Sequence, residues 1–166
     1  MKPIVRRVWA PRGRRPLARS RHRYQWLYLY GFVHPASGEV VWFLFNTVNT
    51  EAFQATLEAF AREVGAGQDK TVILVIDNAG WHVSSDIKPP DGVILVFLPP
   101  YTPQLQPAER LWPLANEAVA NRSFPDLATL DNVLAERCRT LSANPKTIRT
   151  ATLWHWWPDQ THTNES

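Results

Sequence analysis

Asp77 and Glu109 are the two residues of this sequence whose types and positions suggest chemistry. Asp77 directly follows Thr71–Ile76, and Glu109 comes after Val93–Leu98 and a stiff Pro-rich loop, Pro99–Pro107. Apolar runs of this length, rich in β-branched residues and bounded by turn residues, are typical of strands buried on both faces. Because open α/β sheets place ligands at the carboxyl ends of their strands, the two carboxylates could meet at one rim of a sheet.

A pair of carboxylates at such a rim suits a divalent metal site. Mg²⁺ prefers hard carboxylate oxygens and retains several waters, so a few Asp or Glu residues on rigid elements suffice to hold it. Catalysts of phosphodiester chemistry hold two such ions about 3.5–4 Å apart, at the attacking and leaving oxygens. In this interpretation Asp77 bridges two ions and Glu109, in the first turn of a helix, ligates one of them.

Each of these residues also has a purely structural interpretation. Asp77 could be a turn residue, because Asp is favoured where a strand enters a loop. Glu109 stands three residues after Gln106, the spacing of a capping-box glutamate at a helix N-terminus. We expect Asn78 and His82 to support the site from behind the ligands, His82 through a hydrogen bond and Asn78 by shaping the backbone.

Positive charge is concentrated in the N-terminal part of the sequence. The net charge of the 166-residue chain is only +3, yet residues 1–38 contain no Asp or Glu. Such a block of one sign is the usual electrostatic footprint of a polyanion partner, and the alternative is a solvated basic arm. The expected DNA-binding residues are Arg6, Arg7, Arg12, Arg14, Arg15, Arg21 and Arg23.

Composition excludes several other classes of protein. The single cysteine, Cys138, rules out an internal disulfide and a Cys-based zinc site, and its helical apolar spacing indicates a small core residue. No stretch approaches the roughly 18 apolar residues of a membrane span. The N-terminus lacks the apolar region of a signal peptide. We therefore expect a cytoplasmic protein with no membrane partner.

The remaining segments predict an α/β fold, a mixed sheet flanked by helices. Strands that are joined through a helix within one sheet run parallel to each other, whereas a hairpin is antiparallel. A mixed sheet flanked by helices is therefore the natural arrangement. The expected domains are a basic segment (1–24), the main domain (25–142) and a Trp-containing tail (143–166) with a disordered end. Besides the two buried runs, the expected elements are a short strand over Ile4–Ala10, a hairpin over Gln25–Val33 and Val40–Phe45, a helix from Asn49 or Thr50 to about Val64, a helical turn near Val83–Ile87, a helix over Pro107–Asn121 kinked at Pro113, and a helix over Pro125–Leu141.

Three stretches of the sequence resemble a known family, the DDE transposases of bacterial insertion sequences in the mariner superfamily. They are R-R-V-W-A-P-R-G (Arg6 to Gly13), D-N-A-G-W-H (Asp77 to His82) and L-P-P-Y-T-P-Q-L-Q-P-A-E-R-L-W (Leu98 to Trp112). The resemblance implies an RNase H-like fold and three carboxylates that bind Mg²⁺ or Mn²⁺. It also implies DNA as partner, both element ends and target, with cleavage at the ends followed by strand transfer. Asp77 then corresponds to the second carboxylate and Glu109 to the third.

The sequence departs from the pattern of that family in three places. The first catalytic Asp belongs on an opening strand, but no acid precedes Glu39, which falls in the hairpin turn. Gln106 stands where the family usually has Asn, a stronger helix cap. We also expect the helix-turn-helix region, which recognises element ends in that family, to be missing from this chain. We therefore expect a missing or incomplete first strand and impaired catalysis by this chain alone, unless an upstream transposase fragment supplies the strand and its Asp.

Two further interpretations stay open beside the transposase one. A non-catalytic remnant or regulator would bind DNA through the basic segment, with salt-dependent and sequence-independent affinity. Another RNase H-like nuclease would share the metal site, although the long Pro-rich loop before Glu109 resembles the transposases. The resemblance also implies a homodimer acting on paired ends.

Overall fold

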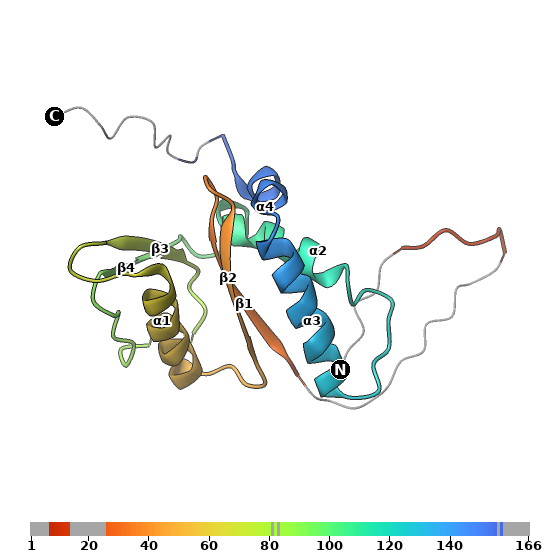
Figure 1. The fold of residues 1–166 in the computed structure, drawn as a ribbon, viewed down its shortest axis with the longest axis horizontal. Helices are drawn as coiled ribbons and strands as arrows, with labels where there is room; N and C mark the ends of the chain where they lie inside the picture. The colour runs from red at the N-terminus through yellow and green to blue at the C-terminus, as the bar shows by residue number, and fades with distance from the viewer. Residues whose placement is uncertain (1–6, 14–25, 81, 83, 156, 158–166) are drawn as a thin grey trace.

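The computed structural model describes residues 7–13, 26–80, 82, 84–155 and 157 (Figure 1). Of the expected strand over Ile4–Ala10, residues 7–10 are irregular instead and the first three lie outside the described residues. The elements in chain order are β1 (Tyr28–His34), β2 (Glu39–Phe45), α1 (Thr50–Val64), β3 (Val72–Ile76), β4 (Val93–Phe97), the 3₁₀ turns η1 (Pro103–Leu105) and η2 (Pro107–Arg110), α2 (Leu111–Asn116), α3 (Leu127–Ser142) and α4 (Pro145–Thr152).

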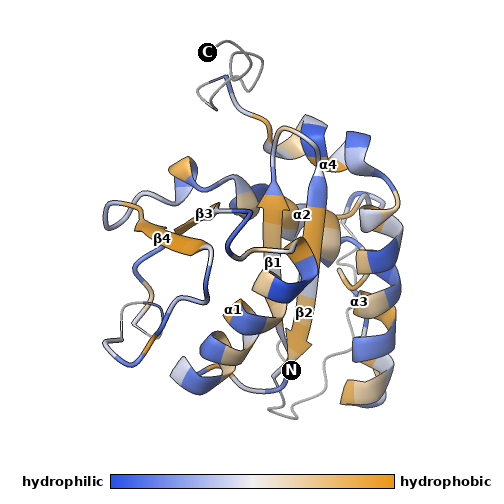
Figure 2. Ribbon diagram, turned by 60° about the vertical axis from the view of Figure 1, so that its left-hand side comes forward, coloured by the Kyte–Doolittle hydropathy of each residue, from blue (hydrophilic) through white to orange (hydrophobic). Residues whose placement is uncertain are grey.

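The β1–β2 hairpin, which the sequence predicts, is the centre of the fold. Its antiparallel register runs from Tyr28 opposite Phe45 to His34 opposite Glu39. Alternate side chains of a strand point to opposite faces, so both faces of this hairpin can be apolar. One face packs on α1, and the other packs on the cluster formed by α2, α3 and α4. Figures 1 and 2 both place the hairpin between α1 and α3.

Helix α1 joins the hairpin to the second pair of strands. The side chain of Asn49 caps its N-terminus by accepting a hydrogen bond from the Ala52 amide at 2.7 Å, and Gly65 ends it in the left-handed conformation, as predicted. Phe53 and Leu57 are buried against aromatic residues of β1 and against the side of β3 and β4 that carries Ile76. Burial of this stripe holds the two pairs of strands together.

The strands form two separate two-stranded sheets. β1 pairs with β2, whereas β3 pairs with β4 in parallel, from Val72 opposite Val93 to Ile76 opposite Phe97. Antiparallel and parallel pairs flanked by helices confirm the predicted α/β class. Within the described residues no strand connects β1 to β3, so the mixed sheet is present as two halves.

The prediction that β3 and β4 are buried on both faces is wrong for one face. Ile73 is 66% exposed, and its neighbours Ile94 and Val96 on β4 are 51% and 43% exposed. Figure 2 shows β4 as an apolar strand at the side of the molecule away from α3. Only the face toward α1 is covered, because no described element packs on the other face.

The helices after Glu109 differ from their predicted course. The expected helix over Pro107–Asn121 is instead a 3₁₀ turn, the short α2 and a run of turns. Pro113 does not kink α2, because it lies in the first turn, where its missing N–H is not needed. Near Val83–Ile87, the described residues form a turn at 85–86 and no helix.

The C-terminal tail contains a helix that the sequence analysis missed. The side chain of Asn144 caps α4, Pro145 occupies its first turn, and Ile148 is completely buried against α2 and the hairpin. Helix α3 buries Cys138 as predicted, and burial raises the pKa of its thiol to about 11. None of the described helices is long and apolar enough to cross a membrane.

Candidate active site

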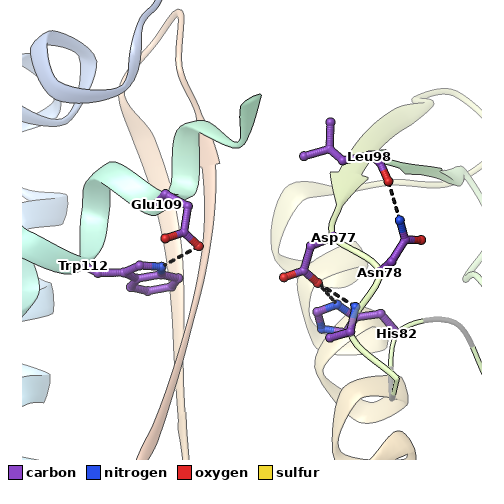
Figure 3. Close-up of polar contacts among 7 residues, drawn as sticks. Asp77, Asn78, His82, Leu98, Glu109 and Trp112 are labelled. Atoms are coloured by element: carbon purple, nitrogen blue, oxygen red, sulfur yellow. Dashed lines mark hydrogen bonds and ion pairs between the residues drawn. The ribbon is translucent and has the colours of Figure 1, made fainter. Parts of the chain in front are cut away.

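Asp77 lies at the carboxyl end of β3 and is held by two contacts of its own loop. Its Oδ1 atom accepts a hydrogen bond from the Ala79 amide at 3.1 Å and lies 2.6 Å from Nδ1 of His82 (Figure 3). The first contact is the turn hydrogen bond that the structural interpretation of Asp77 anticipates. The Asp77 side chain nevertheless remains 51% exposed, whereas that of His82 is only 14% exposed. A fixed, half-exposed carboxylate is able to bind a cation.

Asn78 connects the ends of the two parallel strands. Its side-chain amide donates a hydrogen bond to the carbonyl of Leu98, which directly follows β4. The backbone amide of Leu98 in turn donates to the carbonyl of Ile76 at 2.9 Å. Asn78 therefore holds the ends of β3 and β4 together beside Asp77.

Glu109 lies in η2, directly after the Pro-rich loop. The capping-box alternative is not realised, because no side chain caps η2 at Gln106. The carboxylate of Glu109 instead accepts a hydrogen bond from the indole N–H of Trp112 at 3.3 Å. Pro107 at the start of η2 is buried, so the turn that carries the exposed Glu109 is anchored.

The two carboxylates line one cleft, although their segments lie 32 positions apart in the chain (109 minus 77). Residues of β1 and β3 form its walls, and His82 and Trp112 line it as well. Figure 3 shows Glu109 directed to the indole of Trp112 and Asp77 directed to His82, on two facing segments of the chain. The arrangement gives a polar end to a cleft whose walls are otherwise strand backbone and apolar side chains.

The acidic residues fit a divalent ion only in part. Within the described residues, no three His, Cys, Asp or Glu side chains are close enough together to hold a metal ion. Asp77 and Glu109 supply two hard carboxylates, the ligand type that Mg²⁺ and Mn²⁺ favour. A third ligand of the His, Cys, Asp or Glu type would have to come from outside the described residues.

Tyr30 is a residue of the cleft that the sequence analysis did not single out. It lines the cleft from β1, and its hydroxyl is buried without a hydrogen-bond partner among the described residues. Burial, with a smaller contribution from Tyr28, raises the pKa of this hydroxyl above its usual value. The alternation of β1 could have placed Tyr30 on the α1 face, but no sequence signal indicated a cleft beside it.

Two of the seven predicted DNA-binding arginines lie in the described residues. Arg7 and Arg12 are both exposed, and Trp9 between them is fully exposed. Five lie outside the described residues, namely Arg6, Arg14, Arg15, Arg21 and Arg23. Exposed cations beside an exposed aromatic ring form a surface suited to phosphates and stacked bases.

Comparison with known proteins identifies the family of the chain. Residues 1–131 match the family model of the DDE superfamily endonucleases. The chain belongs to this family. A protein of Sinorhizobium fredii (strain NBRC 101917 / NGR234), called uncharacterized protein y4pE/y4sA, is 35% identical to it over 114 residues, which are 68% of this chain and 81% of that protein.

Two solved structures share the fold of this DDE superfamily chain. They are the Mos1 transposase paired-end complex with left transposon end (TM-score 0.54, 16% identity) and the Mos1 strand transfer complex (TM-score 0.54, 15% identity). They cover 91% and 92% of this chain, which spans about half of each Mos1 chain (51%). The RNase H-like fold expected from the sequence is thereby confirmed.

Proposed function

We propose that this chain is the catalytic domain of a DDE transposase and acts on DNA phosphodiester bonds with Mg²⁺ or Mn²⁺. The observation that carries the proposal is the shared cleft of Asp77 and Glu109, which come from separate segments and lie at the rim of β3. Family membership supports an endonuclease activity. Cleavage of element ends and strand transfer are part of the proposal.

In this proposal the protein holds its carboxylates in fixed positions. Asp77 and Glu109 are the metal ligands and catalytic residues, and a bound divalent ion would activate a nucleophile and stabilise charge on the phosphate. His82 is a positioning residue, since its Nδ1 atom holds Oδ1 of Asp77 at 2.6 Å. Trp112 positions Glu109 in the same way through its indole N–H.

We further propose that the chain alone is an impaired catalyst. Two carboxylates carry less negative charge than three and leave the coordination geometry incomplete. An upstream transposase fragment is the proposed source of the third carboxylate, and the assembled domain is proposed to act as a dimer on paired ends. A non-catalytic DNA-binding role is the second candidate, and the exposed Arg7, Trp9 and Arg12 favour it.

Metal binding provides the direct test of the two proposed ligands. We expect the chain to bind Mn²⁺, measured by the loss of free-ion signal in electron paramagnetic resonance. Asp77→Asn and Glu109→Gln should each weaken this binding at least about tenfold, because each removes one of few charged ligands. Asp86→Asn, at an exposed acid of the loop after β3, is the matched control and should leave binding unchanged. If all three variants bind Mn²⁺ with the same affinity as the wild-type chain, the proposed metal site is wrong.

DNA affinity tests the basic segment separately. We expect Arg7→Ala and Arg12→Ala each to weaken binding to duplex DNA and to reduce the slope of log affinity against log salt by about 0.9, as for one lost phosphate contact. Fluorescence anisotropy at several salt concentrations measures both quantities. Arg62→Ala, an exposed arginine in the last turn of α1, is the control. An unchanged slope in the two test variants would place the DNA elsewhere.

A further inference from the structure

Glu109 lies on a turn that is fixed at its ends and exposed in between. Pro107 at the start of η2 is buried, and Leu111, which follows its end, is completely buried. Glu109 and Arg110 between them are both exposed. Because a 3₁₀ turn has poorer hydrogen-bond geometry than an α-helix, the direction of these two side chains depends on what each of them contacts.

Arg110 contacts a residue that lies far along the chain, Trp154. The central carbon of its guanidinium group lies 4.7 Å from the centroid of the Trp154 ring. This distance is within the range of a cation–π contact, and tryptophan is the side chain that forms the strongest contacts of this kind. The contact joins the turn that carries Glu109 to the C-terminal part of the chain.

Helix α4 holds Trp154 in place. Ile148 anchors this helix in the core cluster that it shares with α2 and the hairpin. The Leu153 amide donates to the carbonyl of Arg149 at 2.8 Å, so the chain is still bonded to α4 directly before Trp154. The ring is therefore presented to Arg110 from an anchored helix.

Beyond Trp154 the chain returns to the cleft. The Trp157 amide donates to the Trp154 carbonyl at 3.0 Å, and the Trp157 side chain lines the cleft together with Glu109 and Trp112. Two tryptophans of the C-terminal tail thus lie near η2, one at Arg110 and one in the cleft that Glu109 lines. The tail belongs to the surroundings of the candidate site.

We propose that Trp154 is a positioning residue for Glu109 and acts through Arg110. The cation–π contact fixes one exposed side chain of η2, so the adjacent residue keeps its carboxylate directed to the indole N–H of Trp112, 3.3 Å away (Figure 3). The positioning itself follows from contacts between described residues. Only its importance for metal binding rests on the proposed function.

Removal of the ring without a change of charge is the most direct test. A substitution of Arg110 would also remove a positive charge next to the carboxylate, and this alone would favour a bound cation. Trp154→Ala leaves every charge in place and leaves Ile148 to anchor α4. Trp154→Phe keeps an aromatic face and should preserve most of the contact.

The first measurement needs no metal. Hydrogen exchange of the Trp112 indole N–H, assigned in nuclear magnetic resonance spectra by its loss in Trp112→Phe, reports the hydrogen bond to Glu109. We expect Trp154→Ala to speed this exchange about two- to fivefold, the range that one cation–π contact allows, and Trp154→Phe to stay close to wild type. Leu153→Ala, at the exposed residue before Trp154, is the matched control and should leave the exchange unchanged. Unchanged exchange in Trp154→Ala would overturn the positioning role.

The second measurement is a double-mutant cycle on Mn²⁺ affinity. Trp154→Ala should weaken binding about two- to fivefold in the wild-type chain, and it should have no further effect once Glu109→Gln has removed the carboxylate. An equal loss in both backgrounds would mean that Trp154 only stabilises the fold, and would reject its positioning role. If Glu109→Gln does not weaken Mn²⁺ binding, the proposed metal site fails, and the exchange measurement decides the positioning of Glu109 by itself.

Discussion

Replacement of Asp77 by asparagine is expected to lower the rate of Mn²⁺-dependent nicking of supercoiled DNA by about 10²–10³-fold. Asparagine preserves the size of the side chain and can still accept a hydrogen bond from the Ala79 amide. It removes the negative charge from the one ligand that sits at the end of β3 and is oriented by His82. The rate is measured from the conversion of supercoiled to open-circular plasmid, starting from the slow rate expected of the wild-type chain.

The control for this experiment is Asp86→Asn, which removes an equal charge from the same connection between β3 and β4. Asp86 is exposed and lies outside the cleft that contains Asp77 and Glu109. We expect the nicking rate of this variant to match wild type. Equal rates for Asp77→Asn and wild type would show that any nicking arises from another site or from a contaminating nuclease, and would remove the main support for the catalytic proposal.

Local signals in the sequence were sufficient to predict the elements that position the site. The β-branched runs Val72–Ile76 and Val93–Phe97 form strands, as short apolar runs bounded by turn residues predict, and the two strands pair in parallel. Helix α1 begins after Asn49 and ends at Gly65. The Asn49 side chain accepts a hydrogen bond from the Ala52 amide, and Gly65 adopts the left-handed conformation that ends a helix. The position of Asp77 at the carboxyl end of β3 follows from these local rules, whereas that of Glu109 depends on the packing of η2 against β1.

Features that depend on distant partners could not be predicted in the same way. The apolar sequence of β3 indicated burial on both faces. A strand face is buried only where another element packs on it, and no described element covers the face that carries Ile73. The expected helix over Pro107–Asn121 contains Pro113, which has no N–H to donate to the carbonyl of Glu109, so the α-helical part begins only at Leu111. Helix α4 is too short to be stable by itself, and it forms where Ile148 packs against the hairpin.

The docking of α4 leads to the second large prediction, at Gly38 in the hairpin turn. Gly38 has a φ of +79°, and a Cβ atom there would lie 2.0 Å from the carbonyl oxygen of Pro145, at the start of α4. Gly38→Ala should therefore cost about 1–2 kcal/mol for the left-handed conformation. It should cost a further ~1–3 kcal/mol because the obstructing atom is backbone and α4 must move. Urea denaturation measures the free energy of unfolding.

Gly65→Ala separates these two contributions. Gly65 also has a positive φ, +66°, but no heavy atom lies within 4 Å of the position that the Cβ atom of an alanine would occupy there. Its substitution should therefore show only the conformational cost of about 1–2 kcal/mol. If both variants lose the same stability, the hairpin turn and α4 do not touch as described. A larger loss at Gly38 means that the turn depends on glycine for two reasons, of which the sequence pattern H-P-A-S-G-E expresses only the backbone conformation.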